Sequence, residues 1–337
     1  KSSFLPKNLA SSYEMLFVFS TKINADNKIC KKTYRTKQKW CSFAFFILLP
    51  FSQKRKRQEK RIAIKIEEVK KMALMETHYY SFSLGSNITL NVFVPTPGSS
   101  EEITEINHTE KYDYEAGLPV LYLLHGAYGD AFSWIRYSNI DRYAQDRGIV
   151  VVMASAENSF YQDLRSGKKY KTFFTEELPT FIQGVFPVSK DREKTYVAGF
   201  SMGGYGAWYL GLSRPDLYAK AASMSGALDI AGLYQSSTIQ ENENNPFSWE
   251  DSFGDPEKLA GSSYDLFALY DQDVAKGCVP KLYQAVGTDD FLYQSNLHVR
   301  DTLQKKNADF VYKEDAGGHD WTFWDKYIQD ILDWLLQ

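Results

Sequence analysis

The sequence of 337 residues is poor in cysteine and histidine, which limits the chemistry it can carry. Its three cysteines are Cys30, Cys41 and Cys278, and two of them precede residue 72. A disulfide framework needs several cysteines within one domain, so the sequence predicts a protein of a reducing compartment, the cytoplasm. The five histidines are scattered without metal-ligand spacing, and no metal site is expected.

Long apolar runs are also missing. The run at residues 40–51 has 12 residues, whereas a helix that crosses a bilayer needs about 20. Basic residues follow this run, where a secretory signal would have small residues at a cleavage site. No membrane partner is therefore expected.

The net charge of −3 hides a discontinuity in the chain. Residues 1–71 contain 18 basic residues (Lys and Arg) and 5 acidic residues (Asp and Glu). Residues 72–337 contain 21 basic and 37 acidic residues. The negative charge of residues 72–337 repels nucleic acid, so nucleic acid is not expected as a partner. The basic part lacks periodic patterning, and codons for residues 67–71 can form a purine-rich ribosome-binding sequence before Met72. We therefore interpret residues 1–71 as a translated upstream leader, with a disordered basic tail or an export signal or membrane anchor as alternatives.

A short run around Ser201 indicates a hydrolase. It reads as a β-branched and aromatic strand, then Gly199-Phe200-Ser201-Met202-Gly203, then a helix that begins with small residues. This is the G-x-S-x-G nucleophile elbow in the strand–turn–helix setting that it requires. The glycines allow strand and helix to approach while the turn holds the serine. The run predicts Ser201 as a nucleophile, although an ordinary glycine-rich connection has a similar composition.

An activated serine needs a base, and the base needs a carboxylate that orients it. Residues 281–292 read as a buried strand that ends at Asp289 and Asp290, and residues 309–321 read as a strand followed by a glycine turn with His319. Both turns follow the carboxyl ends of strands, where a parallel sheet presents its ligands. His319 is the histidine expected to be the base, while the residues alone do not separate Asp289 from Asp290.

The loop after residue 124 is the expected site of an oxyanion donor. Residues 119–124 form an apolar run that ends in His125-Gly126-Ala127, and the loop after the third strand supplies one oxyanion donor in α/β-hydrolases. We predict that the backbone N–H groups of Ala127 and Met202 form the oxyanion hole. His125 is expected to orient the loop and not to carry protons.

Four separate strings together resemble the esterase D-like branch of the α/β-hydrolases. They are LYLLHGAYGDAFSW, FPVSKDREKTYVAGFSMGGYGAW, AVGTDDFLYQSN and GGHDWTFWD. The sequence is most similar to the bacterial tributyrin (acetyl) esterases, and the branch also includes S-formylglutathione hydrolases and feruloyl and acetyl-xylan esterases. The resemblance implies Ser201 as nucleophile, His319 as base and, at the fourth position of a G-T-x-D turn, Asp290 as acid.

One departure from these relatives bears on the substrate. S-formylglutathione hydrolases resemble one another in an oxyanion loop that contains Cys-Thr, whereas this chain has His125-Gly126-Ala127. That difference argues against a glutathione thioester as the main substrate.

Strand-like and helical stretches alternate after residue 72. The expected strands are 78–83, 87–94, 119–124, 149–155, 195–200, 221–225, 281–287 and 309–313. The expected helices are 137–147, 175–186, 203–213, 293–307 and 321–336. This order predicts one domain, residues 72–337, with an α/β-hydrolase fold in which a mostly parallel, twisted sheet of about eight strands carries helices on both faces. Residues 95–117 are expected to form a surface insertion, and residues 234–263 a cap over the site.

These features predict a serine carboxylesterase that hydrolyses short-chain acyl esters without a cofactor, with a small-molecule ester as its partner. A feruloyl or acetyl-xylan esterase is the alternative, followed by an acyltransferase or a non-catalytic binding protein. The motif loops are flanked by aromatic candidates for the substrate pocket, each of which could equally belong to the core: Tyr128, Trp134, Tyr161, Trp321 and Trp324. Chain-length preference and oligomeric state, including a homo-oligomer, are left open.

Overall fold

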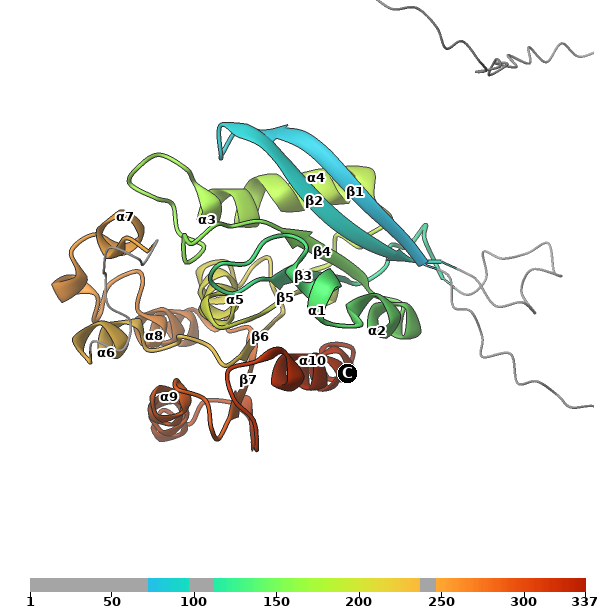
Figure 1. The fold of residues 1–337 in the computed structure, drawn as a ribbon. Coiled ribbons are helices and arrows are strands. Elements are labelled where there is room, and N and C mark those ends of the chain that lie inside the picture. The colour runs from blue at the N-terminus through green and yellow to red at the C-terminus, as the bar shows by residue number, and fades with distance from the viewer. Residues whose placement is uncertain (1–71, 97–111, 237–246) are drawn as a thin grey trace, which may run out of the picture. The chain divides into compact units, whose positions relative to one another are not determined.

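The computed structural model describes residues 72–96, 112–236 and 247–337 (Figure 1). Eight strands in this part of the chain form one sheet in the order β1-β2-β4-β3-β5-β6-β7-β8. They are β1 (Met72–Ser81), β2 (Ser86–Pro95), β3 (Val120–Leu124), β4 (Val150–Ala154), β5 (Thr195–Phe200), β6 (Lys220–Met224), β7 (Lys281–Gly287) and β8 (Phe310–Asp315). Strand β2 runs antiparallel to both of its neighbours, and all pairs from β4 to β8 are parallel. The predicted mostly parallel sheet is confirmed.

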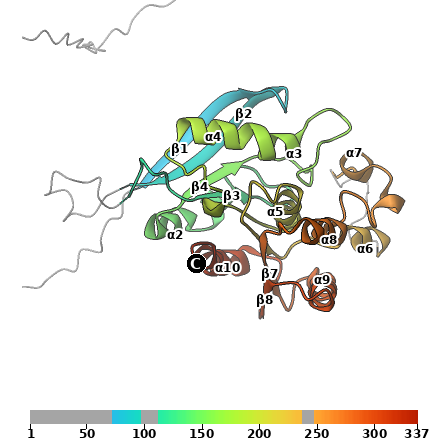
Figure 2. The ribbon, with the colours of Figure 1, turned by 180° about the vertical axis from the view of Figure 1, so that it is seen from behind.

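The central strands are buried on both faces, which explains the continuous apolar sequences of β3 and β4. Every residue of β3, β4, β5 and β6 is buried. Two apolar clusters separate the sheet from its helices, one of them against α1 (Ser133–Tyr137), α2 (Ile140–Arg147) and α10 (Trp321–Leu335). Figures 1 and 2 show α2 and α10 on one side of the sheet and α5 and α8 on the other.

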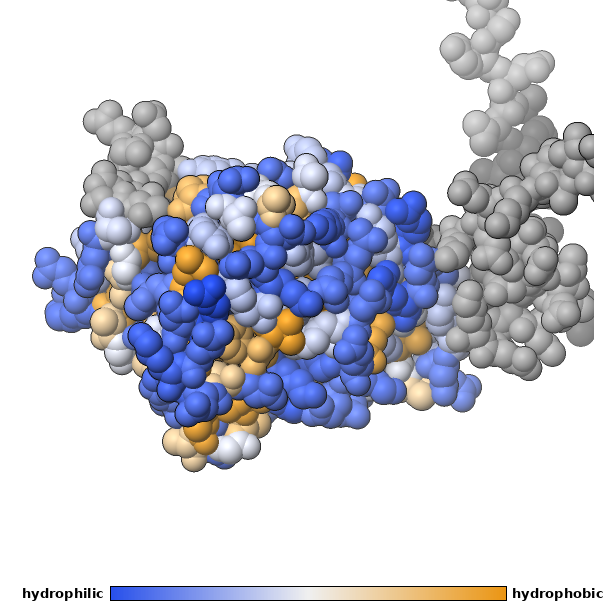
Figure 3. All heavy atoms as spheres, turned by 90° about the horizontal axis from the view of Figure 1, so that it is seen from below, coloured by the Kyte–Doolittle hydropathy of each residue, from blue (hydrophilic) through white to orange (hydrophobic). Residues whose placement is uncertain are grey.

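The second cluster is larger and underlies the remaining helices. These are α3 (Tyr170–Thr172), which continues through a π-helical turn (Phe173–Glu177) into α4 (Leu178–Val185), α5 (Met202–Ser213), α6 (Ile230–Gln235), α7 (Trp249–Phe253), α8 (Leu266–Lys276) and α9 (Tyr293–Lys305). Short 3₁₀ turns lie at Arg192–Lys194 and Pro256–Lys258. In Figure 3, the visible face of the described residues is mainly hydrophilic, with apolar side chains in small groups.

The five expected helices are confirmed, although the one expected at 137–147 begins at Ile140, as α2. Helices α1, α6, α7 and α8 were not predicted. Helix α8 has clear end signals, because the Asp265 side chain accepts the Phe267 N–H at its start and Gly277 adopts a φ of +68° at its end. Within the described ranges, helices of the length and apolarity that a bilayer crossing requires are absent.

Two expected insertions lie partly outside the described residues. The surface insertion at 95–117 is described only at its two ends, and the cap at 234–263 is described up to residue 236 and again from residue 247. The described part of the cap contains α7 and the turn Pro256–Lys258.

Candidate active site

The nucleophile elbow forms where β5 ends and α5 begins. Ser201 lies between these two elements with φ +55° and ψ −120°, a conformation that is uncommon for residues other than glycine. Its N–H donates to the Met224 carbonyl at 2.9 Å, and its carbonyl accepts the Gly204 N–H at 3.0 Å. The neighbouring strand β6 and the first turn of α5 thus hold the serine in the strained position.

Glycines allow the strand and the helix of the elbow to meet. A Cβ atom on Gly199 would lie 2.4 Å from the Gly203 carbonyl oxygen, and a Cβ on Gly203 would lie 2.5 Å from the His125 carbonyl oxygen. Both distances are shorter than atoms tolerate, so a side chain at either position would push the elements apart. The G-x-S-x-G spacing is therefore a packing requirement of this turn.

Three side chains predicted from separate parts of the sequence meet at this turn. The Nε2 atom of His319 lies 2.9 Å from the Oγ of Ser201, and its Nδ1 atom lies 2.9 and 3.0 Å from the carboxylate oxygens of Asp290. The Asp290 side chain is fully buried, and its Oδ1 also accepts the Leu292 N–H at 2.8 Å. Because an ionised carboxylate only accepts hydrogen bonds, His319 carries its proton on Nδ1 and turns the Nε2 lone pair toward the serine.

The neighbouring carboxylate, Asp289, is exposed and lies in the same turn. Its backbone N–H donates to the Gly317 carbonyl, and the Thr288 N–H donates to the Asp315 carbonyl, both at 2.9 Å. These two bonds tie the acid turn to the loop that carries His319. Asp289 therefore contributes its backbone to the site, while Asp290 contributes its carboxylate.

Two aromatic rings fix the imidazole of His319. The Phe291 ring lies 4.5 Å from it, and the Trp324 ring lies 5.1 Å away at an angle of 90°. Trp324 is itself held, because its Nε1 donates to the Ser225 Oγ at 3.1 Å and its ring stacks on Phe200 at 4.1 Å. Trp324, one of the expected pocket residues, is thus a buried support for the histidine.

The predicted oxyanion donors follow two paired strands. Leu124 at the end of β3 pairs with Gly199 on β5. Ala127 lies three residues after Leu124, and Met202 lies three residues after Gly199. Among the described residues, neither the Ala127 N–H nor the Met202 N–H has a hydrogen-bond acceptor. Two free backbone donors therefore flank the elbow.

His125 holds the loop that contains Ala127. Its buried ring accepts the Ala156 N–H at Nε2, at 2.8 Å, and donates from Nδ1 to the Gly126 carbonyl at 2.7 Å. Burial lowers the pKa of His125 below its ordinary value, against the opposing effects of the Gly126 hydrogen bond and Asp130. The neutral ring therefore acts as a fixed link between two loops.

The remaining pocket candidates are in different surroundings. Trp134 and Tyr161 are 1% and 0% exposed, and each donates to a backbone carbonyl, that of Leu124 and that of His125 respectively. They belong to the buried core. Tyr128 is 70% exposed beside Ala127, and Trp321 packs against Trp134 at 5.1 Å.

An aromatic cluster that the sequence reading missed joins the cap to the site loops. Phe160, which has a φ of +52°, contacts rings from the cap and from α5: Tyr205, Phe247, Trp249 and Phe253, at 5.2–5.9 Å. Phe247 also contacts Tyr128 at 5.6 Å. Phe160 lies in a loop, where no periodic pattern indicates which side chains are buried.

A buried polar pair below the acid turn was also missed. Gln284 on β7 and Asn296 on α9 are both 0% exposed. The Gln284 amide donates to the Asn296 Oδ1 and carbonyl at 2.9 Å, and the Asn296 amide donates to the carbonyls of Gly226 and Leu292 at 2.9 and 3.0 Å. The pair thus connects the acid turn with the segment beside the elbow.

A polar cavity of about 470 Å³ lies between the loop after β4 and the start of α7. Its lining includes Asn158, whose Oδ1 accepts the Tyr128 N–H at 2.8 Å, and Asp251. Four serine side chains add hydroxyl groups: Ser159, Ser166, Ser248 and Ser252. Among the described residues, there is no group of three or more His, Cys, Asp or Glu side chains that could hold a metal ion.

Comparison with known proteins identifies the family of this chain. The sequence matches the "Putative esterase" family over residues 100–335. It is 35% identical over 270 residues to an acetyl esterase of Caldicellulosiruptor saccharolyticus, and the match covers 78% of this chain and 98% of that protein.

Two solved structures from Staphylococcus aureus are similar in fold and sequence. The fluorophosphonate-binding serine hydrolase FphF has a TM-score of 0.69 at 30% identity, and the match covers 79% of this chain and 99% of that one. The S-formylglutathione hydrolase FrmB has a TM-score of 0.67 at 30% identity, and the match covers 79% of this chain and 100% of that one. The chain therefore belongs to this esterase family and is a carboxylic ester hydrolase of the α/β-hydrolase fold.

Proposed function

We propose that this protein is a serine carboxylesterase that hydrolyses short-chain acyl esters, acetyl to butyryl, through an acyl-enzyme. The observation that carries the proposal is the unbroken chain of hydrogen bonds from Asp290 through His319 to Ser201. The 35% identity to an acetyl esterase supports a small acyl group.

The first half of the reaction acylates Ser201. His319 Nε2 takes the proton from Ser201 Oγ as this oxygen attacks the ester carbonyl. The free N–H groups of Ala127 and Met202 stabilise the oxyanion that develops. His319 then gives its proton to the leaving alcohol as the C–O bond breaks.

The second half releases the acid. His319 takes a proton from water, the hydroxide attacks the acyl carbonyl, and the proton returns to Ser201 Oγ as the bond to the serine breaks. Throughout, the buried Asp290 keeps the proton of His319 on Nδ1 and stabilises the imidazolium that forms.

Exposed aromatic rings support a preference for small acyl groups. Tyr128 directly follows the oxyanion donor Ala127, and Phe291, which is 62% exposed, contacts the ring of His319. We propose that these bulky rings narrow the entrance. On p-nitrophenyl esters, kcat/KM for octanoate is expected to be at least about tenfold lower than for acetate or butyrate. Equal values for acetate and octanoate would contradict the proposed size limit.

The polar cavity favours a second candidate, an esterase that removes acetyl groups from a hydrophilic alcohol such as a carbohydrate. Its hydroxyl-rich lining suits an alcohol with many hydroxyl groups, and Asn158 connects it to the oxyanion loop. A panel of p-nitrophenyl butyrate, acetylated xylan, methyl ferulate and S-formylglutathione separates the candidates. Higher kcat/KM on acetylated xylan than on p-nitrophenyl butyrate would favour this second function.

A further inference from the structure

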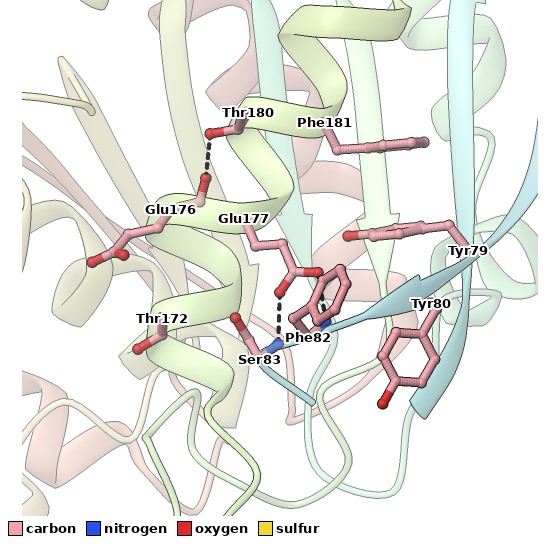
Figure 4. A pocket seen from close by; sticks show the side chains of 9 residues that line it. All are labelled: Tyr79, Tyr80, Phe82, Ser83, Thr172, Glu176, Glu177, Thr180 and Phe181. Atoms are coloured by element: carbon pink, nitrogen blue, oxygen red, sulfur yellow. Dashed lines mark hydrogen bonds between the residues drawn. The ribbon is translucent and has the colours of Figure 1, made fainter. Parts of the chain in front are cut away.

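A second cavity opens between the β1–β2 hairpin and the helical segment α3–α4 (Figure 4). Its volume is about 490 Å³, and it shares no lining residue with the candidate active site. Four aromatic rings, two carboxylates and three hydroxyl side chains form its wall, and no Lys, Arg or His is among them. The lining thus offers ring faces and oxygen atoms without a basic group.

The four rings form two pairs. Tyr79 and Phe181 stack with their centroids 4.3 Å apart, and Tyr80 and Phe82 meet edge to face at 5.4 Å. Phe82 is 87% exposed and Tyr80 is 50% exposed, so both can receive a ligand. The face of an aromatic ring carries partial negative charge, which attracts cations.

Glu177 supplies a full negative charge in this cavity, and Figure 4 shows its carboxylate beside Phe82 and Ser83. Its carboxylate accepts hydrogen bonds from the Ser81 hydroxyl and from the N–H groups of Phe82 and Ser83, at 2.8–3.1 Å. Burial raises the pKa of Glu177, but hydrogen bonds from the Ser83 side chain and N–H, the Ser81 hydroxyl and the Phe82 N–H outweigh burial and hold the pKa below its ordinary value. In the described part of the chain, no Lys, Arg or His lies within ion-pair distance of this carboxylate.

We propose that this cavity binds an organic ammonium ion, with its alkyl groups against Tyr80 and Phe82 and its charge facing Glu177. A metal ion fits poorly, because it needs several oxygen ligands and Glu177 already accepts three hydrogen bonds. A neutral apolar molecule would gain nothing from the carboxylate. An alkylated ammonium ion matches both the ring faces and the unpaired charge.

Titration with tetramethylammonium chloride, observed through its methyl proton signal, tests the proposal on the full chain. We expect saturable binding with a Kd on the order of millimolar. The neutral molecule tert-butanol, which has a similar size, is expected to bind at least about tenfold more weakly. Sodium chloride at the same concentration is the control for ionic strength.

Three variants locate the site. Phe82→Leu keeps an apolar side chain but removes the ring, and it is expected to weaken binding about two- to fivefold. Glu177→Gln removes the charge and is expected to weaken binding at least about fivefold. Tyr137→Leu, at an exposed aromatic residue outside the cavity, is the matched control and should bind as the wild type does.

Melting curves show whether each variant is folded, and Phe82→Leu is the decisive variant if Glu177→Gln does not fold. Hydrolysis of p-nitrophenyl acetate should be unchanged in Phe82→Leu, so the outcome is independent of the proposed function. Binding that does not saturate, equal binding of tert-butanol, or wild-type affinity in Phe82→Leu would overturn the ammonium site.

Discussion

Asp289 and Asp290 are neighbours in sequence but differ in what they contact. The Asp290 carboxylate is buried against the His319 ring, while Asp289 is exposed and contributes its backbone N–H. Asp290→Asn would allow the wrong tautomer of His319, and we expect kcat to fall about 10³–10⁴-fold. Steady-state rates on p-nitrophenyl acetate measure this loss. Asp289→Asn, the matched control, should lose far less, and a larger loss in Asp289→Asn would refute the assignment of the acid.

His125 makes the stability of the fold depend on pH. Its pKa in the folded protein is lowered by burial from the ordinary value of 6.5. As the pH falls below that value, the unfolded chain binds a proton that the folded chain does not, so the free energy of unfolding decreases until the folded pKa is reached. Above pH 6.5 both states are neutral at this position, and the effect vanishes.

Urea unfolding between pH 8 and pH 5 measures this contribution. The wild type should lose more stability over this range than His125→Gln, whose side chain does not titrate. The same pH dependence in both proteins would show that His125 titrates alike in the folded and unfolded states.

At the scale of elements, the pair Gln284 and Asn296 connects β7 and α9 beneath the acid turn. Asn296→Leu would leave the Gly226 carbonyl buried without its donor and the Gln284 amide with only the backbone carbonyl of residue 296 as acceptor, which costs about 1–3 kcal/mol of folding free energy. Because the acid turn would shift, we also expect kcat to fall while KM changes little. Denaturant unfolding and steady-state kinetics measure the two effects.

Gln304→Leu changes an exposed amide on the same helix and is the control for Asn296→Leu. If Asn296→Leu lowers stability but leaves kcat at the wild-type value, the pair stabilises the fold without positioning the acid.

Strands and helices differ in how well the sequence predicted them. All eight strands were predicted, although β1 begins six residues earlier than expected. The clearest were β3 and β4, which are buried on both faces and have continuous apolar sequences that stand out from polar loops. Helix α8 was missed although its caps at Asp265 and Gly277 are readable, because it follows a polar stretch assigned to the cap. Side-chain direction was not predictable: Trp134 and Trp324 both flank motif loops, yet Trp134 packs into the core and Trp324 contacts His319.

At the scale of the whole molecule, the parallel sheet brings distant parts of the sequence together. The elbow, the acid turn and the histidine loop follow β5, β7 and β8, so Ser201 meets a histidine that lies 118 residues further along the chain. This meeting could be predicted, because the motifs and the order of the strands can be read from local sequence. A parallel sheet then places the loops after its strands at one edge. The supports of the site, such as Phe160 and Asn296, depend on long-range packing that one sequence does not reveal.

The most direct test of the account is the esterase rate of Ser201→Ala on p-nitrophenyl acetate. Loss of the nucleophile should lower kcat about 10⁴–10⁶-fold. The melting temperature should stay close to that of the wild type, because the hydroxyl contributes little packing. A folded Ser201→Ala protein that retains more than about a tenth of the wild-type rate would contradict the acyl-enzyme mechanism.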